Sequence, residues 1–302
     1  MNVLLIGLGS IGLKHVNALK KIDSEVDIFA LRSSPSSKHV EGVIDLYDFD
    51  EIQSHQFNFC IISTPTANHK QDISKMVNLG IPLFIEKPLF HTLQIKETVE
   101  LLNASKIKTY VACNLRFLDC VRFVQNELHT KQLRINEVSV YCGSYLPDWR
   151  QNKNYKEIYS AKPEMGGGVH LDLIHEIDYV YWLLGKPKSV RKNLSSNSSI
   201  DIESIDYANY LLSYEDFCAS ITLNYYRRDA KRTFELVCSE GTYYVDLLRN
   251  QVTFNEEIVY SSKQTFIETY TKQLVYFIDN MNKKTFNDAN EALEVLKICL
   301  HD

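Results

Sequence analysis

The chain lacks three features that mark whole classes of protein: a long apolar run, a closely spaced cysteine pair and an excess of basic residues. No apolar stretch approaches the roughly 20 residues of a membrane-spanning helix, so no membrane association is expected. The seven cysteines are widely spaced and include no C-x-x-C pair, a pattern that fits neither a disulfide framework nor a zinc site. The net charge of −5 argues against a nucleic-acid partner and against an anionic membrane surface.

The remaining composition is that of a globular chain of ordinary size. With 302 residues, 45% of them hydrophobic, the chain is long enough for two domains that each have a core. The first apolar strand begins at Val3, which leaves no room for a signal peptide, and the expected location is therefore the cytoplasm. There the cysteines are expected to be reduced and mostly buried, and no metal site is expected.

A glycine-rich turn lies near the N-terminus. The apolar strand 3–6 leads into Gly7-Leu8-Gly9-Ser10-Ile11-Gly12, and an amphipathic stretch follows over 13–21. In this G-x-G-x-x-G pattern the first glycine permits a tight turn, the second lets a pyrophosphate approach the backbone, and the third allows close helix packing. The free N–H groups at the helix start would bind the phosphates. The order of strand, turn and helix predicts a dinucleotide-binding unit; a glycine turn without a nucleotide is the alternative.

Strand and helix patterns alternate as far as residue 117, which predicts a doubly wound parallel sheet. We therefore expect an α/β protein whose N-terminal Rossmann dinucleotide-binding domain spans 1–117. Over 118–302 the chain changes to strands separated by turn residues, which predicts a substrate-binding α+β domain with a large, mainly antiparallel open sheet. Its strands are expected near 135–145, 188–195, 205–213, 217–227, 232–239 and 241–248, and its helices near 168–184, 264–281 and 288–300.

A charged tripeptide, Glu86-Lys87-Pro88, directly follows the predicted buried strand 82–85. Open α/β sheets bind ligands at the carboxyl ends of their strands, so Lys87 can reach the nicotinamide end of a dinucleotide. A salt-bridged turn is the alternative interpretation.

A second polar group lies on the predicted helix 168–184. Its members, at positions i, i+3, i+4 and i+7 of one helix face, are Asp172, His175, Glu176 and Tyr179. Most polar stripes are solvated faces, but the glycines at 166–168 remove side chains where another group must come close.

Oxidation of a secondary alcohol needs a hydride acceptor and a base for the hydroxyl proton. His175, with an ordinary pKa near 6.5, is the natural proton acceptor, and Asp172 would orient it. Lys87 would stabilise the developing alkoxide. His170 lies off the polar stripe and is interpreted as a packing or capping residue.

Together these motifs resemble the glucose-fructose oxidoreductase / inositol dehydrogenase / MocA family, and the resemblance covers essentially the whole chain. Two further segments contribute to it: Thr64-Pro65 followed by Asn68-His69, and Asn114-Leu115-Arg116-Phe117. The resemblance implies that Lys87 is the catalytic lysine, which contacts both the nicotinamide and the reacting hydroxyl, and that Asp172 and His175 complete the site. The chain departs from many members in spacing this pair three residues apart instead of four, and in Asp119 where many have proline.

The expected cofactor is NADP, with NAD as the alternative. An NAD site usually has an acidic residue at the end of the second strand, whereas this strand ends in Leu31-Arg32-Ser33-Ser34. A solvated Arg32 that does not discriminate is the other interpretation. The expected cofactor-binding residues are Gly7, Gly9, Ser10, Ile11, Gly12, Arg32, Ser33, Thr64, Pro65, Asn68, His69, Glu86, Lys87, Asn114 and Arg116.

The expected substrate is a sugar derivative, and an anionic one is favoured by aromatic and cationic residues that precede the glycines. The arginines at 227, 228 and 232 flank a turn of the sheet and are either a solvated hairpin end or a binding site for a carboxylate or phosphate. Trp149 is either a sugar platform or a core residue. The expected substrate-binding residues are Lys87, Arg116, Trp149, Arg150, Tyr155, Tyr159, Asp172 and His175.

The predicted function is therefore that of an NAD(P)-dependent oxidoreductase, which interconverts a hydroxyl and a keto group on a sugar, sugar acid or nucleotide sugar. One alternative is a lyase, epimerase or hydrolase that oxidises its substrate transiently with tightly bound cofactor. The other is a non-catalytic dinucleotide-binding sensor. Because a one-layer sheet must cover its second face, a homodimer or homotetramer through the C-terminal sheet is expected.

Overall fold

The computed structural model describes residues 1–151, 153–283 and 285–300, which form two compact units. The first unit contains residues 1–114 and 266–296, and the second contains 115–265 and the chain from 297 onward. The change of unit at 114 lies close to the expected boundary at 117. The sequence interpretation placed the last two helices in the second domain, whereas most of their residues cluster with the first unit.

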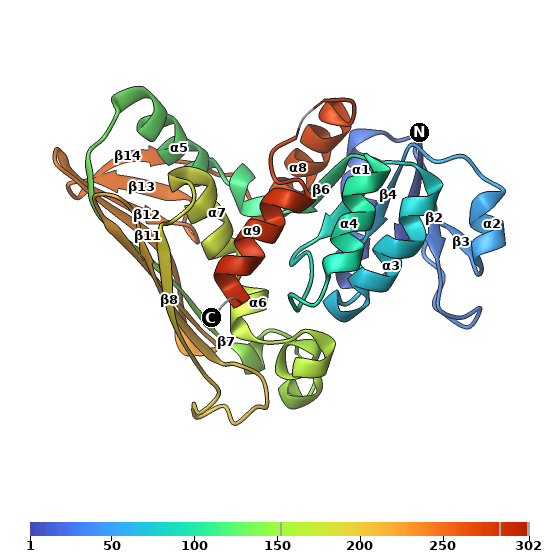
Figure 1. Ribbon diagram of the computed structural model, residues 1–302, viewed down its shortest axis with the longest axis horizontal. Helices are drawn as coiled ribbons and strands as arrows, with labels where there is room; N and C mark the ends of the chain where they lie inside the picture. The colour runs from blue at the N-terminus through green and yellow to red at the C-terminus, as the bar shows by residue number, and fades with distance from the viewer. Residues whose placement is uncertain (152, 284, 301–302) are drawn as a thin grey trace. The chain divides into compact units, whose positions relative to one another are not determined.

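The first unit is a parallel sheet with helices on both faces, as the alternating pattern predicted (Figure 1). Its strands, in sheet order, are β3 (Ile44–Leu46), β2 (Asp27–Leu31), β1 (Asn2–Ile6), β4 (Phe59–Ile62), β5 (Leu83–Glu86) and β6 (Thr109–Ala112). Its helices are α1 (Ser10–Ile22), α2 (Phe49–Gln53), α3 (His69–Met76), α4 (Lys96–Ser105), α8 (Phe266–Asn280) and α9 (Ala289–Leu300), the last continuing into the second unit.

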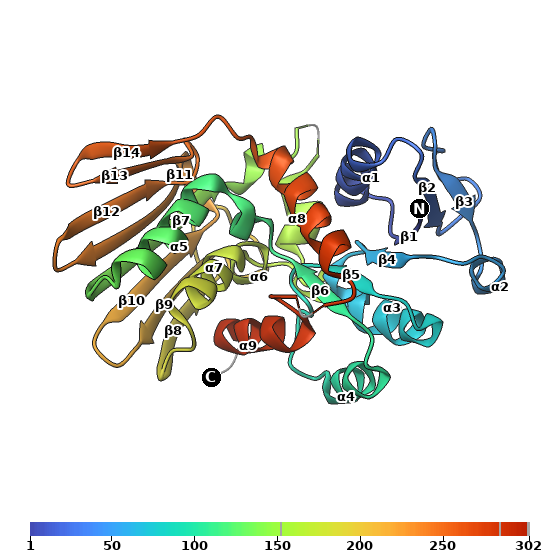
Figure 2. The same cartoon turned by 90° about the horizontal axis from the view of Figure 1, so that it is seen from above.

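The sheet of the first unit is buried because helices cover both of its sides. Figure 2 shows α1 and α8 on one side and α3 and α4 on the other. Strands β4, β5 and β6 are buried at every residue, which explains why each reads as a continuous apolar run instead of an alternating one. Gly80 adopts φ +67° at the end of the turn that follows α3, a conformation that glycine takes at little cost.

The second unit is built on a single large sheet. In sheet order its strands are β14 (Glu257–Ser261), β13 (Gln251–Phe254), β12 (Gly241–Asp246), β11 (Tyr226–Cys238), β7 (Ile135–Tyr145), β10 (Cys218–Asn224), β9 (Tyr207–Ser213) and β8 (Ser189–Ser195). Neighbouring strands are antiparallel except for β7 and β10, which run parallel. The expected mainly antiparallel sheet is thus confirmed with one parallel pair.

Among the described residues, the helices of the second unit cover one face of this sheet. Figures 1 and 2 show α5 (Asp119–Lys131) and α7 (His175–Leu184) on the same side of it. The opposite face carries partly exposed apolar residues in one cross-strand row, Leu211 on β9 and Tyr244 on β12, both 38% exposed.

One helix and two strands of the second unit, α5, β13 (Gln251–Phe254) and β14, have no counterpart in the sequence prediction. In α5 the inward-facing stripe includes a carboxylate, because buried Glu127 accepts a hydrogen bond from the Tyr243 hydroxyl at 2.7 Å. The charge interrupts the apolar periodicity by which a helix is recognised. The others are β13 and β14; the edge strand β14 is mostly exposed and shows no apolar alternation.

The cysteines agree with the sequence interpretation. All seven are free thiols, and all but Cys218 are buried. In the portion of the chain that the structure describes, none of the helices has the length and apolar character needed to cross a membrane.

Candidate functional site

The glycine turn between β1 and α1 is shaped by two different requirements. Gly7 has φ +94°, and a Cβ on it would lie 2.7 Å from the backbone nitrogen of Thr64. A Cβ on Gly12 would lie 2.5 Å from the carbonyl oxygen of Gly7. The Ser63 hydroxyl closes the turn by donating to that same oxygen at 2.6 Å. Packing within the unit therefore requires Gly7 and Gly12.

Gly9 differs, because a Cβ on it would meet no atom within 4 Å. It is exposed, and α1 starts at the next residue. The first turn of α1 contains no acidic side chain, and helix N-termini of this kind favour phosphate groups. Open space above Gly9 and an uncompensated helix N-terminus both fit a dinucleotide pyrophosphate, and Ser10 and Ile11 lie in that first turn.

Arg32 follows β2 as expected, but its guanidinium is already engaged. Nη1 lies 2.6 Å from a carboxylate oxygen of Asp45 on β3, and Nη2 donates to the Lys38 carbonyl oxygen at 2.9 Å. Burial alone would raise the pKa of Asp45, but hydrogen bonds from His39 and Arg32 outweigh it and hold the pKa below its usual value. Ser33, next in the chain, is exposed.

The turn after β4 is held by side chains of the expected set. Thr64 donates its hydroxyl to Asp72 at 2.6 Å, while Pro65 precedes the short 3-10 turn Thr66–Asn68 and is exposed, as is Asn68. His69 is buried: one ring nitrogen lies 3.1 Å from the Thr64 carbonyl oxygen and the other 3.1 Å from the carbonyl oxygens of residues 88 and 89. Burial lowers the pKa of His69.

Lys87 stands at the carboxyl end of β5, where the sequence placed it. Glu86 is the last residue of the strand and is 8% exposed. One of its carboxylate oxygens lies 2.6 Å from Nε2 of His15 on α1, and the other accepts the Lys87 backbone N–H at 3.2 Å. Lys87 itself is partly exposed. Glu86 is therefore engaged with protein groups on both oxygens.

Two predicted ligands near the domain junction are buried and hydrogen-bonded to other residues of the chain. Arg116 is fully buried and forms two hydrogen bonds to Asp178, at 2.9 and 2.7 Å, inside the second unit. A side chain with no exposed surface cannot contact cofactor or substrate, so its assignment to both sets is corrected. Asn114 is 7% exposed and donates to the Thr269 hydroxyl of α8 at 2.7 Å.

The second unit contains a pocket of about 270 Å³ that includes both predicted catalytic residues of the Gly-rich segment. Asp172 is 8% exposed and accepts a hydrogen bond from the Tyr225 hydroxyl at 2.5 Å. Burial, and then the Asp172 charge, raise the pKa of Tyr225 well above its ordinary value, so that hydroxyl remains a donor. The pocket is lined by Cys142, Gly143, Ser144, Trp149, Asp172, Leu173, His175, Ala230, Lys231, Arg232 and Leu248.

The predicted single helix over 168–184 is in fact two helices. α6 (Val169–Asp172) ends at one catalytic candidate and α7 begins at the other, His175, with Leu173 at φ −101°, ψ 29° between them. Every residue from 169 to 174 is buried. A straight helix packed on a sheet buries only one face, so the chain must turn to bury this whole run.

The other residues of the predicted polar stripe are buried inside the unit. Glu176 has no exposed surface and accepts two hydrogen bonds from Arg232, at 2.6 and 3.1 Å. Tyr179 is also fully buried and packs edge-on against Phe234, with ring centroids 5.8 Å apart. The solvated-face alternative is therefore wrong for this stripe.

The glycines before α6 are explained by the chain itself. A Cβ on Gly167 would lie 2.2 Å from the carbonyl oxygen of Tyr159, and Gly168 has φ +129°. The group that comes close is thus the 3-10 turn at 159–161, and the glycines give no independent sign of a ligand. His170 is 7% exposed, as expected of a packing residue, and burial lowers its pKa to about 4.

Of the predicted aromatic and cationic contacts, only Trp149 lines the pocket with Asp172 and His175. Its indole N–H donates to the Ser144 hydroxyl at 2.9 Å, and its ring meets Tyr225 edge-on at 5.2 Å. Arg150 is exposed, Tyr159 is partly exposed, and the Tyr155 hydroxyl donates to a backbone carbonyl oxygen at 3.0 Å; these three do not line this pocket.

The three arginines near the sheet turn have separate roles. Arg227 binds Asp229 at 2.5 Å, and Arg228 donates to the Tyr145 hydroxyl at 2.9 Å. Arg232 alone lines the pocket, where it also holds Glu176. Ser144, which lines the pocket, and Tyr225, which donates to Asp172, are not in the predicted set of site residues. A tyrosine in a strand ordinarily indicates core packing.

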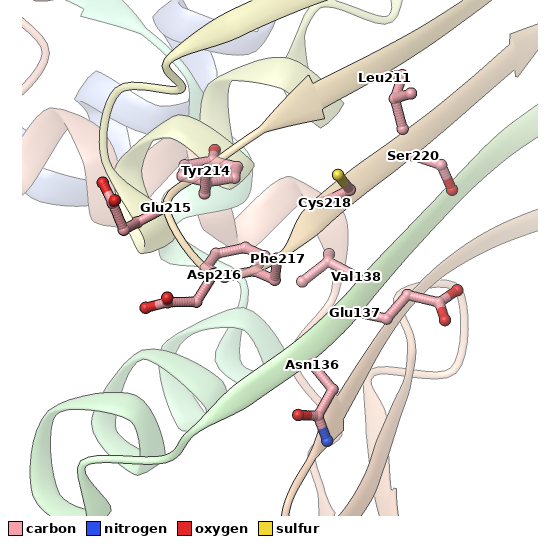
Figure 3. A pocket seen from close by; sticks show the side chains of 10 residues that line it. All are labelled: Asn136, Glu137, Val138, Leu211, Tyr214, Glu215, Asp216, Phe217, Cys218 and Ser220. Carbon is pink, nitrogen blue, oxygen red and sulfur yellow. The ribbon is translucent and has the colours of Figure 1, made fainter.

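A larger hollow of about 570 Å³ lies elsewhere in the second unit, around the turn between β9 and β10 (Figure 3). Its lining includes Glu137, Glu215 and Asp216 but none of the residues predicted for catalysis or binding. Throughout the described residues, no cluster of three or more histidine, cysteine, aspartate or glutamate side chains is arranged to hold a metal ion.

Comparisons with known proteins agree with the division of the chain. Residues 1–112 match a family model described as an oxidoreductase family with an NAD-binding Rossmann fold, and residues 133–244 match the GFO/IDH/MocA C-terminal domain. An oxidoreductase of Synechocystis sp., sll0816, is 26% identical over 209 residues, which are 65% of this chain and 54% of that protein. The scyllo-inositol 2-dehydrogenase (NADP(+)) IolU of Bacillus subtilis is 27% identical over 169 residues, 53% of this chain and 48% of that protein.

The chain thus spans about half the length of these curated relatives. Among solved structures, the WlbA dehydrogenase of Bordetella pertussis, in complex with NADH and UDP-GlcNAcA, superposes with a TM-score of 0.81 at 16% identity. That match covers 99% of this chain and 93% of the WlbA chain, and at this identity it shows a shared fold. With both domain models matched in order, the chain belongs to the GFO/IDH/MocA oxidoreductase family and has its NAD-binding Rossmann domain.

Proposed function

We propose that this protein is an NAD(P)-dependent oxidoreductase that interconverts a hydroxyl and a keto group on a sugar, sugar acid or nucleotide sugar. The observation that carries the proposal is the pocket of the second unit, where a buried carboxylate and a histidine, Asp172 and His175, lie beside Trp149. A polar catalytic pair and an aromatic platform in one pocket suit a substrate that is a ring with hydroxyl groups.

The proposed roles follow from the chemistry of each side chain. Bound NAD(P) supplies the hydride acceptor or donor. His175 takes the hydroxyl proton, because imidazole titrates near neutral pH. The Tyr225 hydroxyl donates to the Asp172 carboxylate at 2.5 Å, and Asp172 orients the substrate and His175. Lys87 hydrogen-bonds the reacting oxygen as negative charge develops on it.

Two properties of the glycine turn support dinucleotide binding: the open space above Gly9 and the positive end of the α1 helix dipole. Open space above Gly9 and the α1 N-terminus fit a pyrophosphate. NADP is the proposed cofactor and NAD the alternative, because a cation, Arg32, and a hydroxyl, Ser33, follow β2 where a 2′-phosphate would bind. Asp45 neutralises part of the Arg32 charge, which makes that side chain the point to test.

For an anionic substrate, the proposed contact is Arg150. It is exposed and follows Trp149 directly in the chain. Two nearby arginines are bound to carboxylates of the protein itself, Arg227 to Asp229 and Arg232 to Glu176.

The experiment is an oxidation screen with NAD and NADP over neutral polyols, free aldoses, sialic-acid-like sugars and nucleotide sugars. Lys87→Met should lower turnover by about 10² or more, the usual contribution of a hydrogen-bond donor to a developing oxyanion, and should leave dinucleotide affinity within a few-fold. His175→Ala should behave alike, whereas His170→Ala is the matched control for loss of an imidazole. Unchanged turnover in Lys87→Met, or a larger loss in His170→Ala than in His175→Ala, contradicts the assignment.

The same screen separates the alternatives. Net reduction of free cofactor identifies a dehydrogenase. Product formation without net change in the cofactor identifies a lyase, epimerase or hydrolase that oxidises transiently. Dinucleotide binding without turnover of any substrate would favour a sensor.

A further inference from the structure

The imidazole of His15 is buried in the first unit and is bound to the residue that precedes Lys87. Its side chain has no exposed surface. His15 Nε2 lies 2.6 Å from Oε1 of Glu86, and Oε2 of Glu86 accepts the backbone N–H of Lys87 at 3.2 Å. One carboxylate therefore links the helix that follows the glycine turn to the backbone of Lys87.

Packing alone does not explain this polar pair. The rings of Phe84 and Tyr270 enclose His15 edge-on, with centroids 5.1 and 5.7 Å away. An apolar side chain of similar volume would fill such a space without the free-energy cost of burying an imidazole and a carboxylate. Within the described residues, Nδ1 of His15 is buried and has no hydrogen-bond partner, so the Glu86 contact is the polar interaction that offsets this cost.

The backbone on the other side of Lys87 is held as well. A ring nitrogen of His69 lies 3.1 Å from the carbonyl oxygens of Pro88 and Leu89, and its other nitrogen lies 3.1 Å from the Thr64 carbonyl oxygen. Lys87 is thus flanked by two buried histidines that connect its backbone to the elements of the proposed cofactor site, α1 and the turn after β4.

We propose that His15 is a positioning residue for Lys87 and acts through Glu86. By fixing the Glu86 carboxylate, the imidazole fixes the backbone from which the Lys87 side chain extends. Without it, that carboxylate would be buried without its partner and would turn toward water, which would release the Lys87 N–H. The proposal rests on the proposed catalytic role of Lys87.

The test uses the full chain with His15→Leu, His15→Gln and, as a matched control, His55→Leu. His55 is exposed and packs on Phe29 with ring centroids 4.8 Å apart. Lysines are reductively methylated with ¹³C, and the Lys87 resonance is identified by its absence in Lys87→Arg. This resonance reports the surroundings of the Lys87 amine whether or not the protein turns over a substrate.

We expect His15→Leu to shift the Lys87 resonance and to lower turnover by about tenfold or more, with dinucleotide affinity kept within about threefold. His15→Gln, whose amide can donate to Glu86, should restore most of both properties, and His55→Leu should change neither. In a Lys87→Met background, His15→Leu should cost no further turnover, because a residue that acts through Lys87 has no effect once that side chain is gone.

An unmoved Lys87 resonance in His15→Leu overturns the positioning role, and so does a loss of turnover matched by an equal loss of dinucleotide affinity. If His15→Leu does not fold, Glu86→Gln gives the same two readouts, since it removes the charge that His15 holds. If the wild type oxidises no substrate, the proposed function fails, and the resonance alone then decides whether His15 positions Lys87.

Discussion

At the scale of single residues, Arg32 offers a test of the proposed preference for NADP over NAD. Its guanidinium faces Asp45 at 2.6 Å. If it binds a 2′-phosphate, Arg32→Ala should weaken NADPH binding by about 10- to 100-fold, the range of a charge-assisted hydrogen bond, and leave NADH binding within a few-fold. Asp45→Asn should strengthen NADPH binding, because the Asp45 carboxylate no longer neutralises part of the Arg32 charge. Fluorescence titration of the wild type and both variants with NADPH and NADH measures these affinities.

One result would contradict the preference for NADP. NADH binding tighter than NADPH in the wild type, together with no effect of Arg32→Ala on either cofactor, would mean that Arg32 only braces the loop between β2 and β3.

His170 makes a residue-scale prediction about stability. Burial lowers its pKa to about 4, below the ordinary value of 6.5, so protonation favours the unfolded chain. The stability that the neutral ring contributes is fully present above pH 6.5 and is lost as the pH falls toward 4. Over that window the loss is about 3 kcal/mol, from 1.36 kcal/mol for each pKa unit.

Chemical denaturation of the wild type and His170→Gln between pH 7.5 and pH 4 measures this effect. The wild-type curve should fall more steeply with acid than the variant curve, since glutamine does not titrate. Parallel curves would show that His170 is not buried in its neutral form. The other lowered histidine pKa, that of His69, acts on both proteins alike.

At the scale of elements, the turn between β1 and α1 separates glycines that the fold needs from Gly9, which is proposed to lie against the cofactor. Gly12→Ala places a methyl 2.5 Å from a backbone oxygen and should destabilise the protein by about 1–3 kcal/mol, as overpacking does. Gly9→Ala meets nothing within 4 Å, so its melting temperature should stay near that of the wild type. Its dinucleotide affinity should fall about tenfold or more, because the methyl occupies the approach of the pyrophosphate.

Thermal unfolding without cofactor measures the melting temperature of each variant, and titration of the same samples measures its dinucleotide affinity. If Gly9→Ala binds dinucleotide as well as the wild type does, the pyrophosphate does not bind at this turn.

At the scale of the whole molecule, the uncovered face of the eight-stranded sheet bears on assembly. Leu211 and Tyr244 lie in one cross-strand row of that face, and Ile258 on β14 is 64% exposed. Apolar side chains on an open sheet favour association with a second copy. We expect a homodimer or homotetramer, and we expect the double variant Leu211→Glu with Tyr244→Glu to reduce the mass measured by light scattering.

The matched control is Ile267→Glu, which changes an exposed apolar residue of α8 in the first unit. It should leave the mass unchanged. A monomeric wild type, or an assembly that survives the double variant, rules out association through this face.

The sequence by itself determined the features that depend on local order along the chain. The glycine turn, the buried strands of the first unit and the place of Lys87 at a strand end all follow from residues close together in sequence. Chain direction and burial pattern decide them, and the structure agrees. The same is true of the mainly antiparallel second sheet, because turn residues at short intervals mark its strands.

Only the tertiary structure decided which polar residues face a pocket and which are bound to other residues inside the fold. Arg116 meets Asp178 across 62 positions, Arg232 meets Glu176 across 56, and Tyr225 meets Asp172 across 53. Periodicity along the sequence shows which side chains share a helix face. It does not show which distant residue each one contacts, because strand order and the turn between α6 and α7 decide that. Charged residues that the sequence suggests as ligands therefore have different places in the structure: Arg116 forms a buried ion pair, whereas Asp172 lines a pocket.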